Sequence, residues 1–195
     1  AVIFGGVLLV LGHIGMAYEG NPATGTGENI VRDTSALLVF YFSLSLIIMG
    51  VGFLKPNIST IVGRLYEEND PRRDSGFSLF YAGINLGALF ASLVCGVLGK
   101  VYGWGYGFGA AGIGMLAGLM MFIWGQKYLR GHAESSSPES LKERVLGMPR
   151  EWLIYLSAIL GLIPVAALMW ATGNNKFTLD IGFDLTLAQM LMLLV

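Results

Sequence analysis

The feature that most constrains this chain is an apolar run of membrane length, from Leu37 to Val62, which contains one charged residue, Lys55. A helix needs about 20 predominantly apolar residues to cross a bilayer, so the run predicts a transmembrane helix. Inserting an ammonium group at membrane depth costs about 2.5–3.5 kcal/mol. Such a charge needs water, a counter-charge or an anionic ligand. With Pro56 and Asn57 directly after it, Lys55 indicates a polar site between helices.

Composition places the rest of the chain in the same class. Of its 195 residues, 54% are apolar and 13% are charged, whereas soluble domains carry about 25% charged residues. We therefore expect an integral membrane protein, and the 28 glycines favour helices that pack closely in lipid. A net charge of −1 leaves no basic surface for phosphates, which argues against nucleic-acid binding. The single cysteine, Cys95, lies in an apolar run and predicts packing rather than chemistry.

Helical periodicity and length predict six spans or parts of spans. They are residues 1–18, 35–65, 76–99, 105–129, 152–172 and 183–195. The first and the last are short or incomplete, and the chain opens without a methionine or a basic leader. We expect it to be an internal piece of a longer polypeptide.

The distribution of Lys and Arg predicts the orientation of the spans, because cytoplasmic loops are enriched in basic residues. The loops between the spans form two alternating sets, and these sets hold three and eight basic residues in total. The eight lie in segments 64–76 and 127–151, which we therefore place on the cytoplasmic side. The first span then runs from inside to outside. Residues 130–151 are polar and interrupted by proline, which predicts a cytoplasmic linker, with a short amphipathic helix over residues 141–146.

The third predicted span has two distinct faces. Small residues recur every four positions along one of them, which favours close packing of another helix: Gly83, Gly87, Ala91, Cys95 and Gly99. A more polar set falls on roughly the opposite side: Tyr81, Asn85, Ala88 and Ser92. A membrane-embedded amide needs hydrogen-bond partners. Asn85 therefore predicts either a helix–helix hydrogen bond or a wet cavity that holds a ligand.

Simpler interpretations apply to other polar residues. Snorkelling does not explain Lys55, because the charged end of its helix begins about 13 Å further along. Glu19, Glu28 and Asp33 are predicted to be solvated loop charges, and His13 a packing residue. The alternation of glycine with aromatic residues over 103–109 predicts an interfacial anchor. It does not fit a phosphate-binding loop, which needs a preceding strand and a following Gly-Lys-Ser/Thr.

Two motifs on consecutive helices carry a resemblance to a known family. The run GFLKPN at residues 52–57 and the run FYAGINLGAL at residues 80–89 resemble the proton-dependent oligopeptide transporter family. Its signature reads FYxxINxGSL, and only the serine differs, with Ala88 in its place. The resemblance implies a partial major facilitator superfamily fold, all-α and embedded in the membrane.

The resemblance also implies a domain organisation. Residues 1–129 would be helices three to six of the amino-terminal bundle, residues 130–151 a cytoplasmic linker, and residues 152–195 two additional transmembrane helices, the second truncated. The inside-to-outside direction of the first span, obtained from loop charges, agrees with a third helix. The protein would be a multi-pass protein of the cell inner membrane.

Site roles follow from the resemblance, position by position. Lys55 resembles a cavity lysine that is tied both to the carboxylate of a bound peptide and to proton coupling. Asn85 resembles an asparagine that hydrogen-bonds the peptide backbone, and Tyr81 is a weaker candidate for the same cavity. The expected partners are di- and tripeptides, protons and the lipid bilayer. No cofactor and no metal is expected, with protons as the coupling ion.

The function implied is proton-coupled symport of di- and tripeptides by alternating access. The family's Glu-x-x-Glu-Arg motif, which would supply the proton-linked carboxylate, is not in this sequence. Two alternatives stay open: a relative that transports another anionic solute, such as nitrate or a drug-like carboxylate, and a non-transporting membrane scaffold or enzyme. The spans contain no paired carboxylates, nucleophile–base set or metal cluster, so we do not expect an enzyme.

Overall fold

The structure is a computed structural model of antiparallel helices. It describes residues 1–25, 31–67, 69–129, 131–132, 138–145, 147–173, 178–180 and 184–186. The long helices among them are α1 (Val2–Met16), α2 (Thr34–Arg64), α3 (Arg73–Val101), α4 (Trp104–Gly125) and α6 (Arg150–Gly173). The short elements are the 3-10 helix η2 (Gln126–Tyr128), α5 (Pro138–Lys142), and the strands β1 (Arg144–Val145), β2 (Met148–Pro149), β3 (Thr178–Asp180) and β4 (Asp184–Thr186).

The long helices coincide with the first five predicted spans. Four of them are long and apolar enough to cross a membrane: α2, α3, α4 continued by η2, and α6. The fifth, α1, has 15 residues. The predicted span at 183–195 lies outside the described residues except for 184–186, which form β4 and pair with β3. That span therefore stays a prediction.

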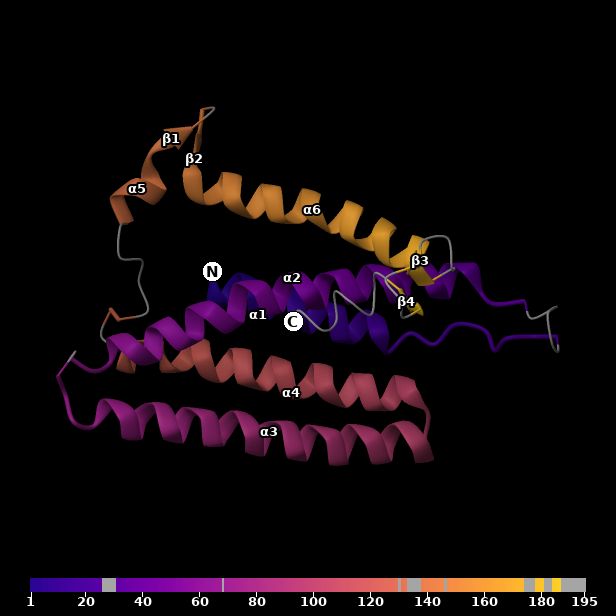
Figure 1. The fold of residues 1–195 in the computed structure, drawn as a ribbon, viewed down its shortest axis with the longest axis horizontal. Coiled ribbons are helices and arrows are strands. Elements are labelled where there is room, and N and C mark those ends of the chain that lie inside the picture. The colour runs from indigo at the N-terminus through magenta and orange to yellow at the C-terminus, as the bar shows by residue number, and fades with distance from the viewer. Residues whose placement is uncertain are drawn as a thin grey trace.

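The helices run side by side and alternate in direction, as Figure 1 shows. Helix α1 contacts α2 and α4, α3 contacts α4, and α6 contacts α2. The turn at 65–72 and the β1–β2 hairpin lie at one end, which we call the inner end after its predicted orientation. The loop after α1 and the turn at 102–103 lie at the other, which we call the outer end.

Glycines bring α1 and α2 into backbone contact. A Cβ placed on Gly50 would lie 2.9 Å from the carbonyl oxygen of Gly5, and one on Gly12 would lie 2.9 Å from the carbonyl oxygen of Ser43. Only small residues allow this approach. The sequence signal is a seven-residue spacing on both helices, from Gly5 to Gly12 and from Ser43 to Gly50.

Helix α6 packs along α2 through apolar side chains. Leu8, Leu46 and Leu162 form a buried cluster, with Phe4 and Met49 against it. Aromatic contacts extend the interface, for example between the rings of Phe4 and Tyr155, whose centroids are 4.6 Å apart. Helix α6, the described helix of the predicted segment 152–195, thus packs directly against the α1–α2 pair.

Helix α3 lies at the edge of the bundle and uses only part of its predicted packing face. A Cβ on Gly99 would lie 2.7 Å from the Trp104 ring, and one on Gly107 of α4 would lie 2.7 Å from the carbonyl oxygen of Cys95. At Gly83 and Gly87 a Cβ would meet no atom within 4 Å. The predicted seam therefore contacts α4 only toward the outer end, where the two helices converge on their short turn.

The segment before α6 differs from the predicted helix at 141–146. Helix α5 ends at Lys142, and Arg144 and Val145 instead pair with Pro149 and Met148 in an antiparallel hairpin. Gly147, with φ of +81°, supplies the turn. A left-handed residue in this position favours a hairpin over a continued helix. Residues 130, 133–137 and 146 of the predicted linker lie outside the described residues.

Candidate functional site

Lys55 lies on the exposed side of α2, about 13 Å along the helix from its inner end. It borders an open cavity of about 530 Å³. The other residues that line this cavity also belong to α2: Ile48, Met49, Val51, Gly52, Phe53 and Pro56. The predicted lysine is therefore placed at a groove whose remaining lining side chains are apolar.

Pro56 stands inside α2 rather than ending it. Because proline has no N–H, the carbonyl of Gly52 receives no helical hydrogen bond from residue 56. Neighbouring side chains bond the carbonyls that follow it. Asn57 Nδ2 donates to the Phe53 oxygen at 2.6 Å, and Thr60 Oγ1 donates to the Pro56 oxygen at 2.8 Å. The helix nevertheless continues through Lys55 and Pro56 to Arg64.

Tyr81 and Asn85 lie on α3, and both are exposed. The Tyr81 ring stacks on Phe77, with centroids 6.4 Å apart and an interplanar angle of 26°. Counted from the first residue of α3, Tyr81 and Asn85 are about 12 Å and 18 Å along the helix. Since α2 and α3 are antiparallel, these depths bracket that of Lys55.

The structure does not bring the three predicted residues into one pocket. The cavity at Lys55 is lined by α2 alone. Helices α2 and α3 meet near their shared turn, where Gly76 packs against the Tyr66 ring and the Phe77 ring lies 3.5 Å from a Cβ placed on Gly63. Asn85 is exposed on α3 and lines neither the cavity at Lys55 nor the one in the turn at the inner end, and its predicted role stays a prediction.

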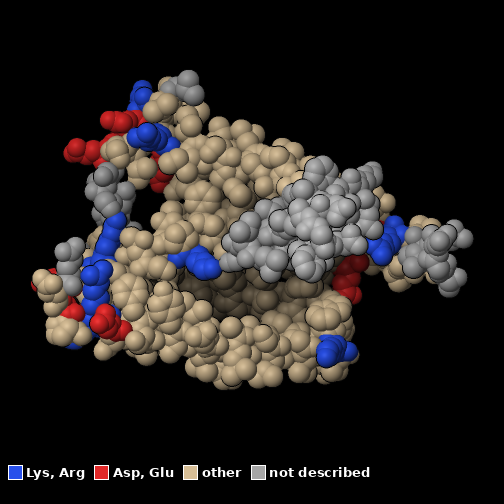
Figure 2. Space-filling view, viewed as in Figure 1, with Lys and Arg blue, Asp and Glu red and all other residues tan. Residues whose placement is uncertain are grey.

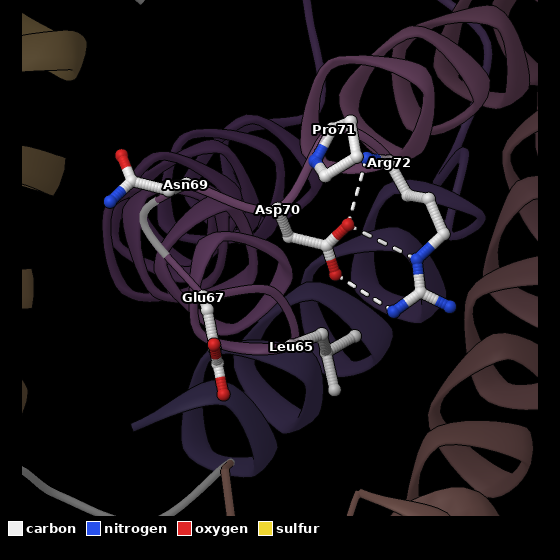
Figure 3. Close-up of a pocket in the computed structure, with 6 residues that line it drawn as sticks. All are labelled: Leu65, Glu67, Asn69, Asp70, Pro71 and Arg72. Atoms are coloured by element: carbon white, nitrogen blue, oxygen red, sulfur yellow. Dashed lines mark hydrogen bonds and ion pairs between the residues drawn. The ribbon is translucent and has the colours of Figure 1, made fainter.

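A second cavity, of about 640 Å³, lies in the turn at the inner end and is shown in Figure 3. Its main feature is a bidentate ion pair between Asp70 and Arg72, which we call the Asp70–Arg72 fork. Arg72 Nη2 and Nε donate to the carboxylate at 2.8 and 3.1 Å, and the Arg72 backbone N–H donates at 2.9 Å. These bonds lower the pKa of Asp70 and raise that of Arg72. Both charges are satisfied within the turn, so the fork is a structural feature of the α2–α3 connection.

Glu19 caps α4, a contact that its prediction as a solvated loop charge did not include. Its carboxylate accepts a hydrogen bond from the backbone N–H of Gly105, 86 residues away and in the first turn of that helix. A negative charge is favourable at a helix N-terminus, where unpaired N–H groups carry partial positive charge. No local sequence pattern indicates this contact.

Asp33 is likewise an N-cap, a role that its prediction as a solvated loop charge did not include. It accepts hydrogen bonds from the backbone N–H groups of Ser35, Ala36 and Asn21, from the Ser35 hydroxyl and from the Asn21 amide. These bonds, led by the Asn21 backbone N–H, hold the pKa of the Asp33 carboxyl well below its usual range. An Asp directly before a long apolar run is a recognised helix-start signal, so the sequence contained this information. The third predicted loop charge, Glu28, lies outside the described residues.

The glycines of the 103–109 segment have packing roles that the anchor interpretation missed. A Cβ on Gly105 would lie 2.7 Å from the carbonyl oxygen of Ala17, and Gly107 faces α3 at Cys95. Gly103 has φ of +116°, which favours glycine. The segment thus brings the start of α4 against both α1 and α3, while Trp104 and Tyr106 stay exposed.

Charged side chains on the face shown in Figure 2 gather mainly at the inner end, while the flanks of the helices are largely uncharged. His13 is satisfied within α1, where its Nδ1 lies 2.8 Å from the Leu9 carbonyl oxygen. Among the described residues, no group of three or more His, Cys, Asp or Glu side chains is placed to hold a metal ion. The chemistry available at the candidate site is therefore that of a lysine in an apolar groove.

Comparison with known proteins gives the family. The model of the POT family matches residues 1–148. Three curated transporters are similar: the uncharacterized transporter YclF of Bacillus subtilis, 46% identical over 73% of this chain; the peptide transporter YePEPT of Yersinia enterocolitica, 42% over 63%; and a di-/tripeptide transporter of Lactococcus lactis, 37% over 90%. This chain spans 26%, 21% and 33% of their respective lengths.

A solved structure agrees with the helical arrangement. The crystal structure of a peptide transporter POT in complex with sulfate matches 98% of this chain and 34% of its own, at 34% identity and a TM-score of 0.59. The major facilitator fold expected from the paired motifs is therefore confirmed for the part that this chain covers. The GFLKPN and FYAGINLGAL runs, the five long helices and the family match lead to one conclusion: the chain belongs to the POT family.

Proposed function

We propose that the full-length protein is a proton-coupled symporter of di- and tripeptides that works by alternating access in a bacterial inner membrane. Two of the similar proteins are named as peptide transporters. This chain covers about a fifth to a third of their lengths, so the proposal concerns the whole protein. The observation that carries it is Lys55, a charge held at mid-helix beside an apolar groove.

Lys55 suits the recognition of a peptide carboxylate. Its ammonium group is a donor with a full charge, and a charge-assisted hydrogen bond to a carboxylate is about twice as strong as a neutral one. In a low-dielectric groove this contact strengthens further. The apolar residues beside it, such as Phe53, accept side chains of varied chemistry.

Asn85 and Tyr81 would serve the other polar groups of the same peptide. An amide side chain both donates and accepts, which matches the N–H and C=O groups of a peptide backbone. Both residues lie at about the depth of Lys55 along antiparallel helices. Their exposure leaves them accessible to a ligand between α3 and the rest of a complete transporter.

Proton coupling would use the same lysine. An ammonium group near a carboxylate lowers the pKa of that carboxylate, and the pKa rises again when the lysine turns to another partner. A peptide that takes over Lys55 would thus promote protonation of a carboxylate elsewhere in the full-length protein. Protons are the only coupling ion in this scheme, and no cofactor is required.

The test is transport by the purified full-length protein in liposomes. In the Lys55→Ala variant, proton-driven accumulation of a dipeptide should fall by at least about tenfold, as expected for the loss of one charged hydrogen bond. A dipeptide amide lacks the carboxylate, so it should inhibit dipeptide uptake by the native protein less than a free dipeptide does. In the Lys55→Ala variant, the amide and the free dipeptide should inhibit the remaining uptake equally.

Lys100→Ala is the matched control, because it removes the same charge from the outer end of α3. It should transport like the native protein. Undiminished dipeptide accumulation by Lys55→Ala would overturn the proposal. If the Lys55→Ala variant still preferred the free dipeptide over the dipeptide amide, Lys55 would have no role in recognition of the carboxylate. Its role in proton coupling would remain.

A second candidate is transport of a different anionic solute by the same lysine. It is favoured by the solved relative, which is described in complex with sulfate, an inorganic anion. In the liposome assay, accumulation of nitrate or sulfate that is lost in Lys55→Ala, without accumulation of dipeptides by the native protein, would support this candidate over the first.

A further inference from the structure

The three residues after Tyr18 link the starts of two different helices. Glu19 accepts a hydrogen bond from the backbone N–H of Gly105 in the first turn of α4. Two positions later, Asn21 donates to Asp33 Oδ2 from its backbone N–H at 3.1 Å and from its side-chain amide at 2.9 Å. Asp33 is the N-cap of α2. One short segment therefore contacts the N-terminal ends of both α2 and α4.

Gly20 makes this double contact possible. Its φ of +66° lies in the left-handed region, where only glycine is readily accommodated. A Cβ at this position would overlap that of Ala36 in the first turn of α2 and would lie 3.2 Å from Asp33 Oδ2. The backbone of Gly20 thus lies against α2, while Glu19 contacts α4 and Asn21 contacts the N-cap of α2.

Helix α4 depends on this segment for its cap. Its own N-cap residue, Gly103, provides no side-chain hydrogen bond. The Gly105 N–H is instead paired with Glu19, and the position has no room for a side chain because the Ala17 carbonyl lies against it. The end of α1 and the start of α4 are therefore joined by both a charge and a close backbone approach.

We propose that residues 19–21 form an outer clasp, a conformational device that couples the first turn of α2 to the first turn of α4. Each contact fixes the segment and so lowers the entropic cost of forming the other. Loss of either contact should then loosen both helix starts. This coupling is independent of the substrate and of the transport proposal, because it rests on contacts at the outer end alone.

Hydrogen–deuterium exchange of the full-length protein tests the coupling. The reporters are the Gly105 amide for α4 and the Ser35 and Ala36 amides for α2. Glu19→Ala, which touches only the α4 contact, should raise exchange about fivefold in both first turns, the effect expected for losing one helix cap. Asn21→Ala, which removes the side-chain bond to Asp33 at the start of α2, should also raise exchange in both first turns.

The result that would overturn the clasp is a local one: each variant affects only the helix that it contacts. Glu67→Ala is the matched control for Glu19→Ala, since it removes an exposed carboxylate at the inner end. It should leave both first turns unchanged. The combined Glu19→Ala/Asn21→Ala variant should exchange little faster than either single variant, whereas independent caps would give additive effects.

A rescue experiment keeps the proposal testable if the variants are generally less stable. A Cβ on Gly109 would lie 3.9 Å from the Cβ of Ala17, within the range that a disulfide spans. With Ala17→Cys and Gly109→Cys added to Glu19→Ala, oxidation should restore slow exchange at both helix starts, and reduction should reverse it. Recovery at α4 without recovery at α2 would show that the two ends are not coupled.

Discussion

Asp33 caps α2 and Lys55 lies within it, but their surroundings differ. Asp33 is saturated by hydrogen bonds from the first turn of α2 and from Asn21. Lys55 stands in the middle of α2, beside a proline that interrupts the backbone hydrogen bonds. The first arrangement stabilises the start of a helix, and the second presents a charge to a groove.

The pH dependence of the Asp33 cap provides a prediction at this scale. A carboxyl group whose pKa is lowered on folding contributes stability that is present above its unfolded pKa, near 4, and is lost as pH falls through the folded pKa. Asp33→Ala should therefore lower Tm by a constant amount between pH 8 and 5.5, and by less below about pH 4. Thermal unfolding of the full-length protein measures this, and a Tm difference that already declines between pH 8 and 5.5 would contradict it.

At the scale of elements, helix association depends on which glycines meet a backbone. The α1–α2 pair approaches through Gly5 and Gly50, whereas Gly83 and Gly87 of α3 face open space among the described residues. Small residues that recur at a helical spacing therefore do not by themselves identify the face that packs. The partner helix must supply matching positions, as Ser43 and Gly50 do for α1.

Replacing Gly50 with alanine should disrupt the α1–α2 pair. The added methyl group would lie 2.7 Å from Leu9 Cγ and 2.9 Å from the Gly5 carbonyl oxygen, and overpacking of this kind costs about 1–3 kcal/mol. Gly114→Ala in α4 is the matched control, because a Cβ there meets no atom within 4 Å. Thermal unfolding should show a lower Tm for Gly50→Ala only, and equal values for the two variants would contradict the close approach.

At the scale of the whole molecule, the chain is a multi-pass protein of the cell inner membrane, and its described residues include four helices long and apolar enough to span it. On the face shown in Figure 2, its charged side chains gather mainly at the inner end. This distribution follows the enrichment of basic residues in cytoplasmic loops. The α2–α3 turn is therefore expected on the cytoplasmic side and the loop after α1 outside.

Cysteine labelling of intact cells tests this orientation. Ala23→Cys, in the loop after α1, should react with a membrane-impermeant maleimide, because it is exposed at the outer end. Asn69→Cys, exposed in the α2–α3 turn, should react only after the cells are permeabilised. The native Cys95, within α3, serves as the background. The reverse pattern would mean that the positive-inside assignment is wrong.

The sequence predicted which residues belong to the candidate site, but it did not predict how they are arranged in space. Lys55 stands out because a charge is rare in a membrane span, and Asn85 because the motif around it matches a family pattern. Their depths along α2 and α3 follow from helix rise alone. The sequence could not show that the cavity at Lys55 is lined only by α2, because that depends on how far α3 diverges from its neighbour.

The sequence by itself determined the class of protein and the five long helices. In a bilayer the backbone must satisfy its own hydrogen bonds, so an apolar run of sufficient length has to be a helix. Only the tertiary structure decided that Glu19 caps α4, that glycines join α1 to α2 and that strands β1 and β2 pair as a hairpin. Two of these depend on contacts between residues far apart in the chain, and the third on a single turn at Gly147. A local pattern encodes the period of a helix, but it does not encode which distant atoms the helix meets.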